Sequence, residues 1–140
     1  GATAFALSPS CTPKDVNLVK KLFESVGIAE QVQEAQLDAV TGLSGSGPAY
    51  IFLLIEALTD AGVEQGLARP LAQQLAAQTV AGSANLALST GDHPAVLRNQ
   101  VPSPGGPTAA GLAALEKGAF HHAILDAVAS ATKRSRELGS

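Results

Sequence analysis

The chain has 140 residues, of which 46% are hydrophobic and 15% are charged, so its composition is that of a folded domain rather than a disordered segment. The formal net charge of −3 gives no electrostatic basis for binding nucleic acid. A lone cysteine, Cys11, excludes an intramolecular disulfide. There is no signal-peptide pattern and no apolar run of the roughly 18 residues that a membrane span needs. We therefore expect a soluble, cytoplasmic protein that binds no membrane.

The first 37 residues predict a β-α-β unit. Residues 2–7 and 28–32 are short apolar runs of the kind that form strands. Between them, Thr12 and Pro13 provide a helix cap and a first helical residue, and apolar residues then recur at helical spacing. Such a unit normally belongs to a larger parallel sheet. We therefore expect this segment to be the end of a domain that begins in a preceding part of a longer protein.

From residue 38 onward, the sequence predicts helices only. The expected helices cover residues 48–62, 70–90, 94–101, 107–117 and 120–138. We expect Asp92 to cap the third of them. The helix at residues 49–62, AYIFLLIEALTDAG, is apolar nearly all round. Such a helix is normally buried, which predicts the core of a dimer; the alternative is the central helix of a monomeric bundle.

Other polar motifs give little support for a reactive centre. Gly45-Ser46-Gly47 resembles part of a dinucleotide-binding turn, but the third glycine is missing and no predicted strand precedes it. We expect a tight junction between helices there. His121 and His122 are adjacent and would point about 100° apart in a helix, and His93 has no companion ligand. The sequence therefore predicts no metal site.

The stretch VPSPGGPT, residues 101–108, is the strongest candidate site. If Gly106 caps the next helix, Pro107 falls at the first helical position, where proline is well tolerated. The N–H groups of Thr108 and Ala109 would then be free, with the Thr108 hydroxyl beside them, and such groups bind anions. From composition alone, a sharp turn between helices is the simpler interpretation. The residues do not exclude an anion-binding site, so both interpretations stay open.

Three stretches together carry a resemblance to a known family: LSGSGPAYIFLLIEALTDAGVEQGL, LRNQVPSPGGPTAAGLAALEKGAF and a last helix ending in KRSREL. In this order they resemble pyrroline-5-carboxylate reductase, over residues 1–138. The resemblance implies reduction of Δ1-pyrroline-5-carboxylate to L-proline with NAD(P)H, the last step of proline biosynthesis. It also implies a mainly α chain. Residues 1–37 would be the closing strand-helix-strand of an incomplete Rossmann domain. Residues 38–140 would be an all-α domain for substrate binding and dimerisation, within a homodimer or a higher oligomer.

The resemblance also implies a site. The substrate carboxylate is expected on backbone groups of the turn, and the hydroxyl of Thr108 is expected to hydrogen-bond the ring nitrogen and assist its protonation. Thr108 is thus the expected catalytic residue. The expected substrate-binding residues are Ser103, Gly105, Gly106, Pro107, Thr108 and Ala109. The residues that bind the cofactor, and so choose between NADH and NADPH, would lie in a preceding part of the protein.

The chain also departs from the family pattern. Pro102 and Pro107 stand where the family usually has other small residues, and Asn99 stands where an acidic residue is common. Pro107 removes one N–H from the turn, which implies weaker or differently shaped binding. Without a G-x-G-x-x-G turn, the chain alone is expected to bind no cofactor and to have no reductase activity. The alternatives are a stand-alone helical dimerisation module without catalysis and the helical domain of another Rossmann-type dehydrogenase.

Overall fold

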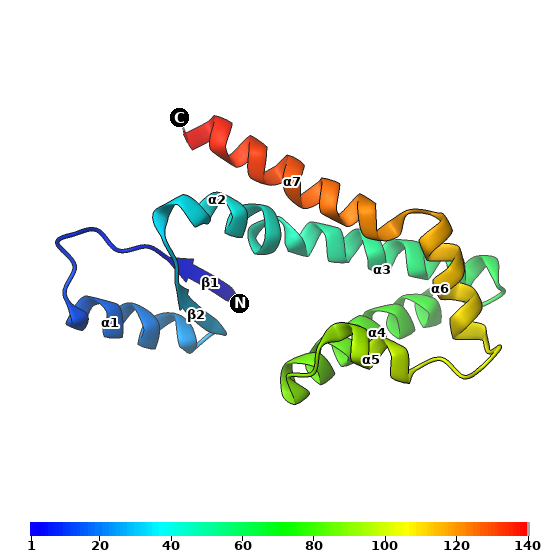
Figure 1. Ribbon diagram of the computed structural model, residues 1–140. Coiled ribbons are helices and arrows are strands. Elements are labelled where there is room, and N and C mark those ends of the chain that lie inside the picture. Colours follow the sequence, from blue (N-terminus) through cyan, green and yellow to red (C-terminus); the bar gives the residue numbers. More distant parts are fainter. Residues whose placement is uncertain (140) are drawn as a thin grey trace. The chain divides into compact units, whose positions relative to one another are not determined.

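The computed structural model describes residues 1–139, which fold as two compact units (Figure 1). One unit combines residues 1–48 with the chain from Ala123 on, and the other spans Ala49–His122. The elements are mainly helices with one small parallel sheet, so the predicted fold class is confirmed. The predicted domain boundary at residues 37 and 38 stays a prediction.

The first unit begins with the predicted β-α-β unit. Strand β1, Ala2–Phe5, pairs in parallel with β2, Ile28–Gln31, and helix α1, Pro13–Glu24, connects them. The register runs from Ala2 opposite Ile28 to Phe5 opposite Gln31. Both strands are shorter than the apolar runs predicted, because each has only this one partner among the described residues.

The start of α1 follows the predicted capping pattern. Thr12 is the N-cap and Pro13 is the first helical residue. The Asp15 carboxylate accepts a hydrogen bond from the Thr12 N–H and another from the Thr12 hydroxyl, each at 2.7 Å. The bond from the Thr12 backbone, and secondly the bond from its side chain, lower the pKa of Asp15 below its ordinary value of 3.8. The charged carboxylate therefore holds the first turn together.

Lowering the pH should weaken this cap. The pKa of Asp15 is lower in the folded chain than in the unfolded chain. The ionised carboxylate therefore stabilises the fold fully at pH values above its ordinary pKa of 3.8, and this stabilisation is lost as the pH falls through the pKa of the folded chain. An NMR titration of the carboxyl should give a pKa below 3.8. Thr12→Ala removes the hydrogen bond from the Thr12 side chain, which is the smaller of the two causes, and keeps the bond from the backbone. The pKa of Asp15 should therefore rise but stay below its ordinary value. A wild-type pKa at or above the ordinary value would contradict this assignment.

Two short helical turns and the last helix complete the first unit. After the 3-10 turn η1, Glu34–Gln36, comes α2, Leu37–Val40, which runs into the π-helical turn η2, Thr41–Gly45. In η2 the Ser46 N–H donates to the Thr41 carbonyl at 2.8 Å. The predicted junction is thus helical, with the wider turn of a π-helix.

Helix α7, Phe120–Gly139, packs against η2 at Gly42, which is buried. A Cβ atom added at Gly42 would lie 2.9 Å from the Thr132 nitrogen and 2.9 Å from the Val128 oxygen. The Ser135 hydroxyl also donates to the Asp38 carboxylate at 2.6 Å. This approach of α7 to the chain about 90 residues earlier therefore requires glycine at position 42.

The second unit contains four helices (Figure 1). They are α3, Gly47–Glu64, α4, Arg69–Thr90, α5, Pro94–Gln100, and α6, Pro107–Lys117. The start of α4 returns against α3, where the Arg69 guanidinium donates to the Asp60 carboxylate at 2.8 Å. Gly62 of α3 and Ala72 of α4 let the two helices approach closely, since a Cβ added at Gly62 would lie 3.1 Å from the Ala72 Cβ.

The predicted cap of α5 was wrong by one residue. The N-cap is His93, whose Nδ1 accepts a hydrogen bond from the Ala95 N–H at 3.2 Å. Because Pro94 occupies the first helical position, the cap must be the residue directly before it. Asp92 lies one residue too early, and its N–H donates instead to the Thr90 hydroxyl at 3.2 Å.

The interior of the described chain is small. Its buried apolar residues are Ala29, Ala72 and Ala76, and Thr59 is a buried polar residue. None of the large apolar side chains of α3 in the described chain is buried, and Phe52 is 69% exposed. The monomeric-bundle alternative would bury these side chains inside this chain, which the structure does not do. No helix within the described residues is long and apolar enough to cross a membrane.

Candidate functional site

The candidate site is the connection between α5 and α6. The Ser103 carbonyl accepts a hydrogen bond from the Gly106 N–H at 3.0 Å, which closes a four-residue turn with Pro104 and Gly105 at its centre. Gly105 has a φ of 68°, in the left-handed region. Proline followed by a left-handed glycine is the pattern of a type II turn. The glycine at position 105 is therefore fixed by backbone conformation.

The second glycine of the turn lies in close contact with Ser103. Gly106 is the N-cap of α6 and Pro107 is its first residue, as the sequence predicts. A Cβ added at Gly106 would collide with the Ser103 hydroxyl oxygen and would lie 3.1 Å from the Ser103 carbonyl oxygen. Ser103 therefore lies directly against the backbone of the cap, and a side chain at position 106 would require the Ser103 hydroxyl to rotate away and its carbonyl to shift slightly.

The Ala109 N–H, one of the two donors predicted to be free, already has an acceptor inside the chain. The Ala109 N–H donates to the Gly106 carbonyl at 3.2 Å, and the Ala110 N–H donates to the same oxygen at 3.4 Å. The prediction that Ala109 has a free N–H was thus wrong, because the first turn of α6 closes tightly with a bond between residues three apart.

Other donors of the turn remain available. The N–H groups of Ser103, Gly105 and Thr108 have no acceptor among the described residues. The Thr108 hydroxyl has no hydrogen-bond partner in the same part of the chain, and its residue is half-buried. Ser103, Gly105, Pro107 and Ala109 are exposed. The turn therefore offers N–H donors and one hydroxyl to an anion that approaches from solvent.

In the sequence, the Gly45-Ser46-Gly47 stretch resembles part of a dinucleotide-binding turn, and the structure gives its place in the fold. Gly45 ends the π-helical turn and Gly47 begins α3, so the G-S-G stretch follows a helical segment rather than a strand. It therefore lacks the strand-turn-helix context in which glycines hold a dinucleotide. The residues that the structure describes also contain no cluster of three or more metal-ligating side chains.

Comparison with known proteins decides the family. The model of the family described as "Pyrroline-5-carboxylate reductase dimerisation" matches residues 34–138, a range that includes the turn, helices α2 to α6 and α7 up to its last residue but one. The chain belongs to the pyrroline-5-carboxylate reductase family. The resemblance predicted from the sequence is thereby confirmed.

Relatives and solved structures of this family match nearly the whole chain. The Arabidopsis thaliana pyrroline-5-carboxylate reductase is 53% identical over 137 residues, which are 98% of this chain and 50% of the relative. The reductase structure from Coxiella burnetii superposes with a TM-score of 0.92 at 37% identity, over 96% of this chain and 50% of that one. The structure of the Plasmodium falciparum enzyme, which has NADP bound, gives a TM-score of 0.89 at 37% identity, over 98% and 53%. The chain thus spans about half the length of the pyrroline-5-carboxylate reductases it matches.

Proposed function

We propose that the chain is part of an enzyme that reduces Δ1-pyrroline-5-carboxylate to L-proline with NAD(P)H, in the cytoplasm, as a homodimer or a higher oligomer. The observation that carries the proposal is the match to pyrroline-5-carboxylate reductases over 98% of the chain at 53% identity. The name of the family model, which refers to dimerisation, and the exposed apolar residues of α3 support the homodimer.

In this proposal the substrate binds at the Ser103–Thr108 turn. Its carboxylate accepts hydrogen bonds from N–H groups of the turn, of which those of Ser103, Gly105 and Thr108 lack an internal acceptor. Pro107 supplies no N–H and Ala109 has donated its own to Gly106, so these two residues would contribute shape rather than donors. Gly105 would admit the carboxylate close to the backbone, since a Cβ added there has no atom within 4 Å, and Gly106 would leave room for the Ser103 side chain beside it.

The Thr108 hydroxyl is the proposed catalytic group. It would donate a hydrogen bond to the ring nitrogen of the substrate and assist the protonation of that nitrogen as the imine carbon is reduced. The support is its place in the first turn of α6, beside the Thr108 N–H, and the absence of a competing partner in the described chain. NAD(P)H would be the reductant of the whole enzyme. The Gly45-Ser46-Gly47 stretch follows a helical turn rather than a strand, so no step is assigned to the cofactor on this chain.

An activity measurement tests this function. A longer protein that contains this chain should oxidise NADPH or NADH only when Δ1-pyrroline-5-carboxylate is present, and it should form proline. The 140-residue chain alone should show no such activity, because it lacks a dinucleotide turn. A longer protein that folds but makes no proline would overturn the proposal in favour of a dimerisation module. Activity of the chain alone would overturn the assignment of the cofactor site to another part of the protein.

A further inference from the structure

The first turn of α5 is capped by a single residue, His93. Pro94, at the first helical position, has no N–H to donate. The Ala95 N–H donates to the imidazole Nδ1 of His93 at 3.2 Å. The N–H groups of Val96 and Leu97 donate to the His93 carbonyl at 2.8 Å and 3.3 Å. Each N–H of this turn therefore has its acceptor on His93, and one of these acceptors is a side-chain nitrogen.

Helix α5 has little else to hold it within this chain. It has seven residues, and none of them is buried. A helix of this length is marginal unless its ends are capped or its side chains are packed. Its side toward α4 borders an open groove, which is lined by Ser83, Leu86, Ala87, Pro94, Leu97, Arg98 and Val101. The stability of α5 therefore depends strongly on the bonds that His93 accepts.

The imidazole of His93 can cap α5 only in its neutral form. Its Nδ1 accepts a hydrogen bond only while it carries no proton, and both ring nitrogens of an imidazolium are donors. Histidine is also the side chain that changes its charge between about pH 8 and pH 5. Protonation would leave the Ala95 N–H without its acceptor, and it would add a positive charge where the helix dipole disfavours cations. Acid therefore weakens the cap by two effects.

Few charged groups lie around this cap. Asp92 directly precedes His93, and it shares no hydrogen bond or ion pair with the imidazole in the described chain. Arg98 lies on α5 itself, and its guanidinium donates to the Asn99 side chain at 3.4 Å. The neighbouring helix α4 has no titratable side chain after Arg69, its first residue. No ion pair therefore fixes the charge of His93, which follows the pH of the solution.

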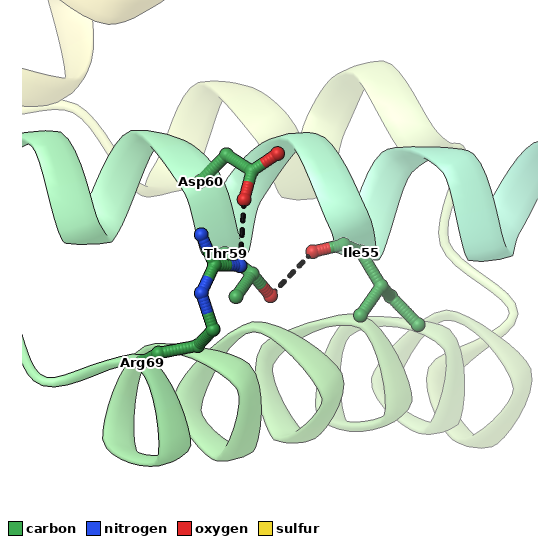
Figure 2. Close-up of polar contacts among 4 residues, drawn as sticks. All are labelled: Ile55, Thr59, Asp60 and Arg69. Atoms are coloured by element: carbon green, nitrogen blue, oxygen red, sulfur yellow. Dashed lines mark hydrogen bonds and ion pairs between the residues drawn. The ribbon is translucent and has the colours of Figure 1, made fainter.

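The contact between α3 and α4 depends on other kinds of side chain. Arg69 pairs with the Asp60 carboxylate at 2.8 Å, and the Thr59 hydroxyl donates to the Ile55 carbonyl at 2.7 Å (Figure 2). Arginine, aspartate and threonine side chains do not change their charge in the range where histidine does. Mild acid should therefore loosen α5 and leave the contact between α3 and α4 in place.

The other end of α5 leads directly into the candidate site. Val101 caps this end, and its N–H donates to the Arg98 carbonyl at 3.4 Å. Val101 is helical, with a φ of −80° and a ψ of −42°, although Pro102 follows it and a residue before proline prefers extended backbone. The helical conformation of Val101 therefore depends on α5. If α5 loosens, Val101 can become extended, which turns the Ser103 N–H away from the other donors of the turn.

We propose that His93 is a positioning residue for the Ser103–Thr108 turn, which it holds through α5 only while its imidazole is neutral. Acid then weakens the binding of the substrate carboxylate. The proton donor, Thr108, lies beyond the turn on α6, so its step is affected less. The effect on the substrate rests on the function proposed above, whereas the effect on α5 rests only on contacts inside the chain.

Substitutions at His93 test this role in the longer protein that contains this chain. His93→Asn keeps a side-chain acceptor that caps helices well and does not titrate in this range. The ratio of the wild-type KM to the His93→Asn KM cancels the protonation of the substrate itself. This ratio should rise about threefold or more from pH 8 to pH 5.5, within the size of one capping interaction, while the corresponding ratio of kcat stays within about twofold. His93→Ala, which has no acceptor, should have a raised KM at both pH values. A constant KM ratio, or a fall in kcat instead of a rise in KM, overturns the positioning role.

Hydrogen exchange of the same proteins gives an answer that needs no activity. Relative to its rate in an unfolded peptide, exchange of residues 94–101 should speed up about threefold or more in acid in the wild type and stay constant in His93→Asn. Exchange of α4 should be equal in both. An equal change of residues 94–101 in the two proteins overturns the cap as the cause. The expected exchange in a protein that reduces no Δ1-pyrroline-5-carboxylate overturns the proposed function and leaves the pH-sensitive cap in place.

Pro102→Ala tests the link between α5 and the turn. With alanine after it, Val101 can stay helical without support from α5. In this background acid should still loosen α5, but it should raise KM no more than it does in His93→Asn. If acid raises KM as much in Pro102→Ala as in the wild type, the link through Val101 is wrong.

Discussion

Gly42→Ala should destabilise the chain by about 3 kcal/mol, although alanine is the better helix former by roughly 1 kcal/mol. The added Cβ would lie 2.9 Å from the backbone nitrogen of Thr132 and 2.9 Å from the backbone oxygen of Val128. A backbone cannot rotate away as a side chain can, so α7 must move from η2. That movement would also stretch the 2.6 Å hydrogen bond between Ser135 and Asp38. The cost therefore combines overpacking with the loss of a half-buried hydrogen bond.

Urea unfolding followed by circular dichroism measures this effect, and a glycine inside α4 provides a control. Gly82→Ala makes an identical change within a helix, where an added Cβ has no atom within 4 Å and no proline follows. That variant should lose no stability, and it should gain up to about 1 kcal/mol from helix propensity. Equal effects of the two substitutions would show that α7 does not pack on Gly42.

The elements that could be predicted were those marked by local chemistry. Thr12 before Pro13 and Gly106 before Pro107 mark helix starts, because proline is tolerated at the first helical position and a cap must directly precede it. The same rule, applied to Pro94, would have placed the α5 cap on His93. The error at Asp92 came from preferring the more usual capping residue to the fixed position of the proline.

What could not be predicted depends on residues far apart in the sequence. In the sequence, Gly42 belongs to a Gly/Ser-rich stretch that predicts a tight junction between helices, and only the return of α7 about 90 residues later shows why its side chain must be absent. The apolar sequence of α3 predicted a buried helix, but a helical pattern does not show whether the same chain or a second molecule covers it. In the turn, the pattern placed Gly106 and Pro107 correctly but missed that Ala109 bonds back to Gly106, since the tightness of a first turn is not encoded in residue types.

Thr108→Ala should lower the turnover number for Δ1-pyrroline-5-carboxylate reduction about 100-fold in the longer protein that contains this chain, within the range that general acid groups contribute. The fold should be unaffected, because the hydroxyl has no hydrogen-bond partner in the described chain and its loss breaks no internal contact. KM should change little, because the carboxylate is proposed to bind backbone N–H groups that alanine retains. A rate loss without a stability loss is the signature of a group that acts on the substrate.

Thr108→Ser separates the hydroxyl from the methyl group. Serine keeps the oxygen at the start of α6, so the turnover number of the Thr108→Ser variant should stay within about tenfold of the wild type. The alanine and serine variants should unfold at the same urea concentration. If alanine and serine reduce the rate equally, the hydroxyl is not the proton donor and Thr108 acts only by its shape. If alanine raises KM and leaves the turnover number unchanged, Thr108 binds the substrate without assisting the protonation of its nitrogen. Both results leave the carboxylate turn in place, because its donors belong to the backbone of Ser103, Gly105 and residue 108 itself.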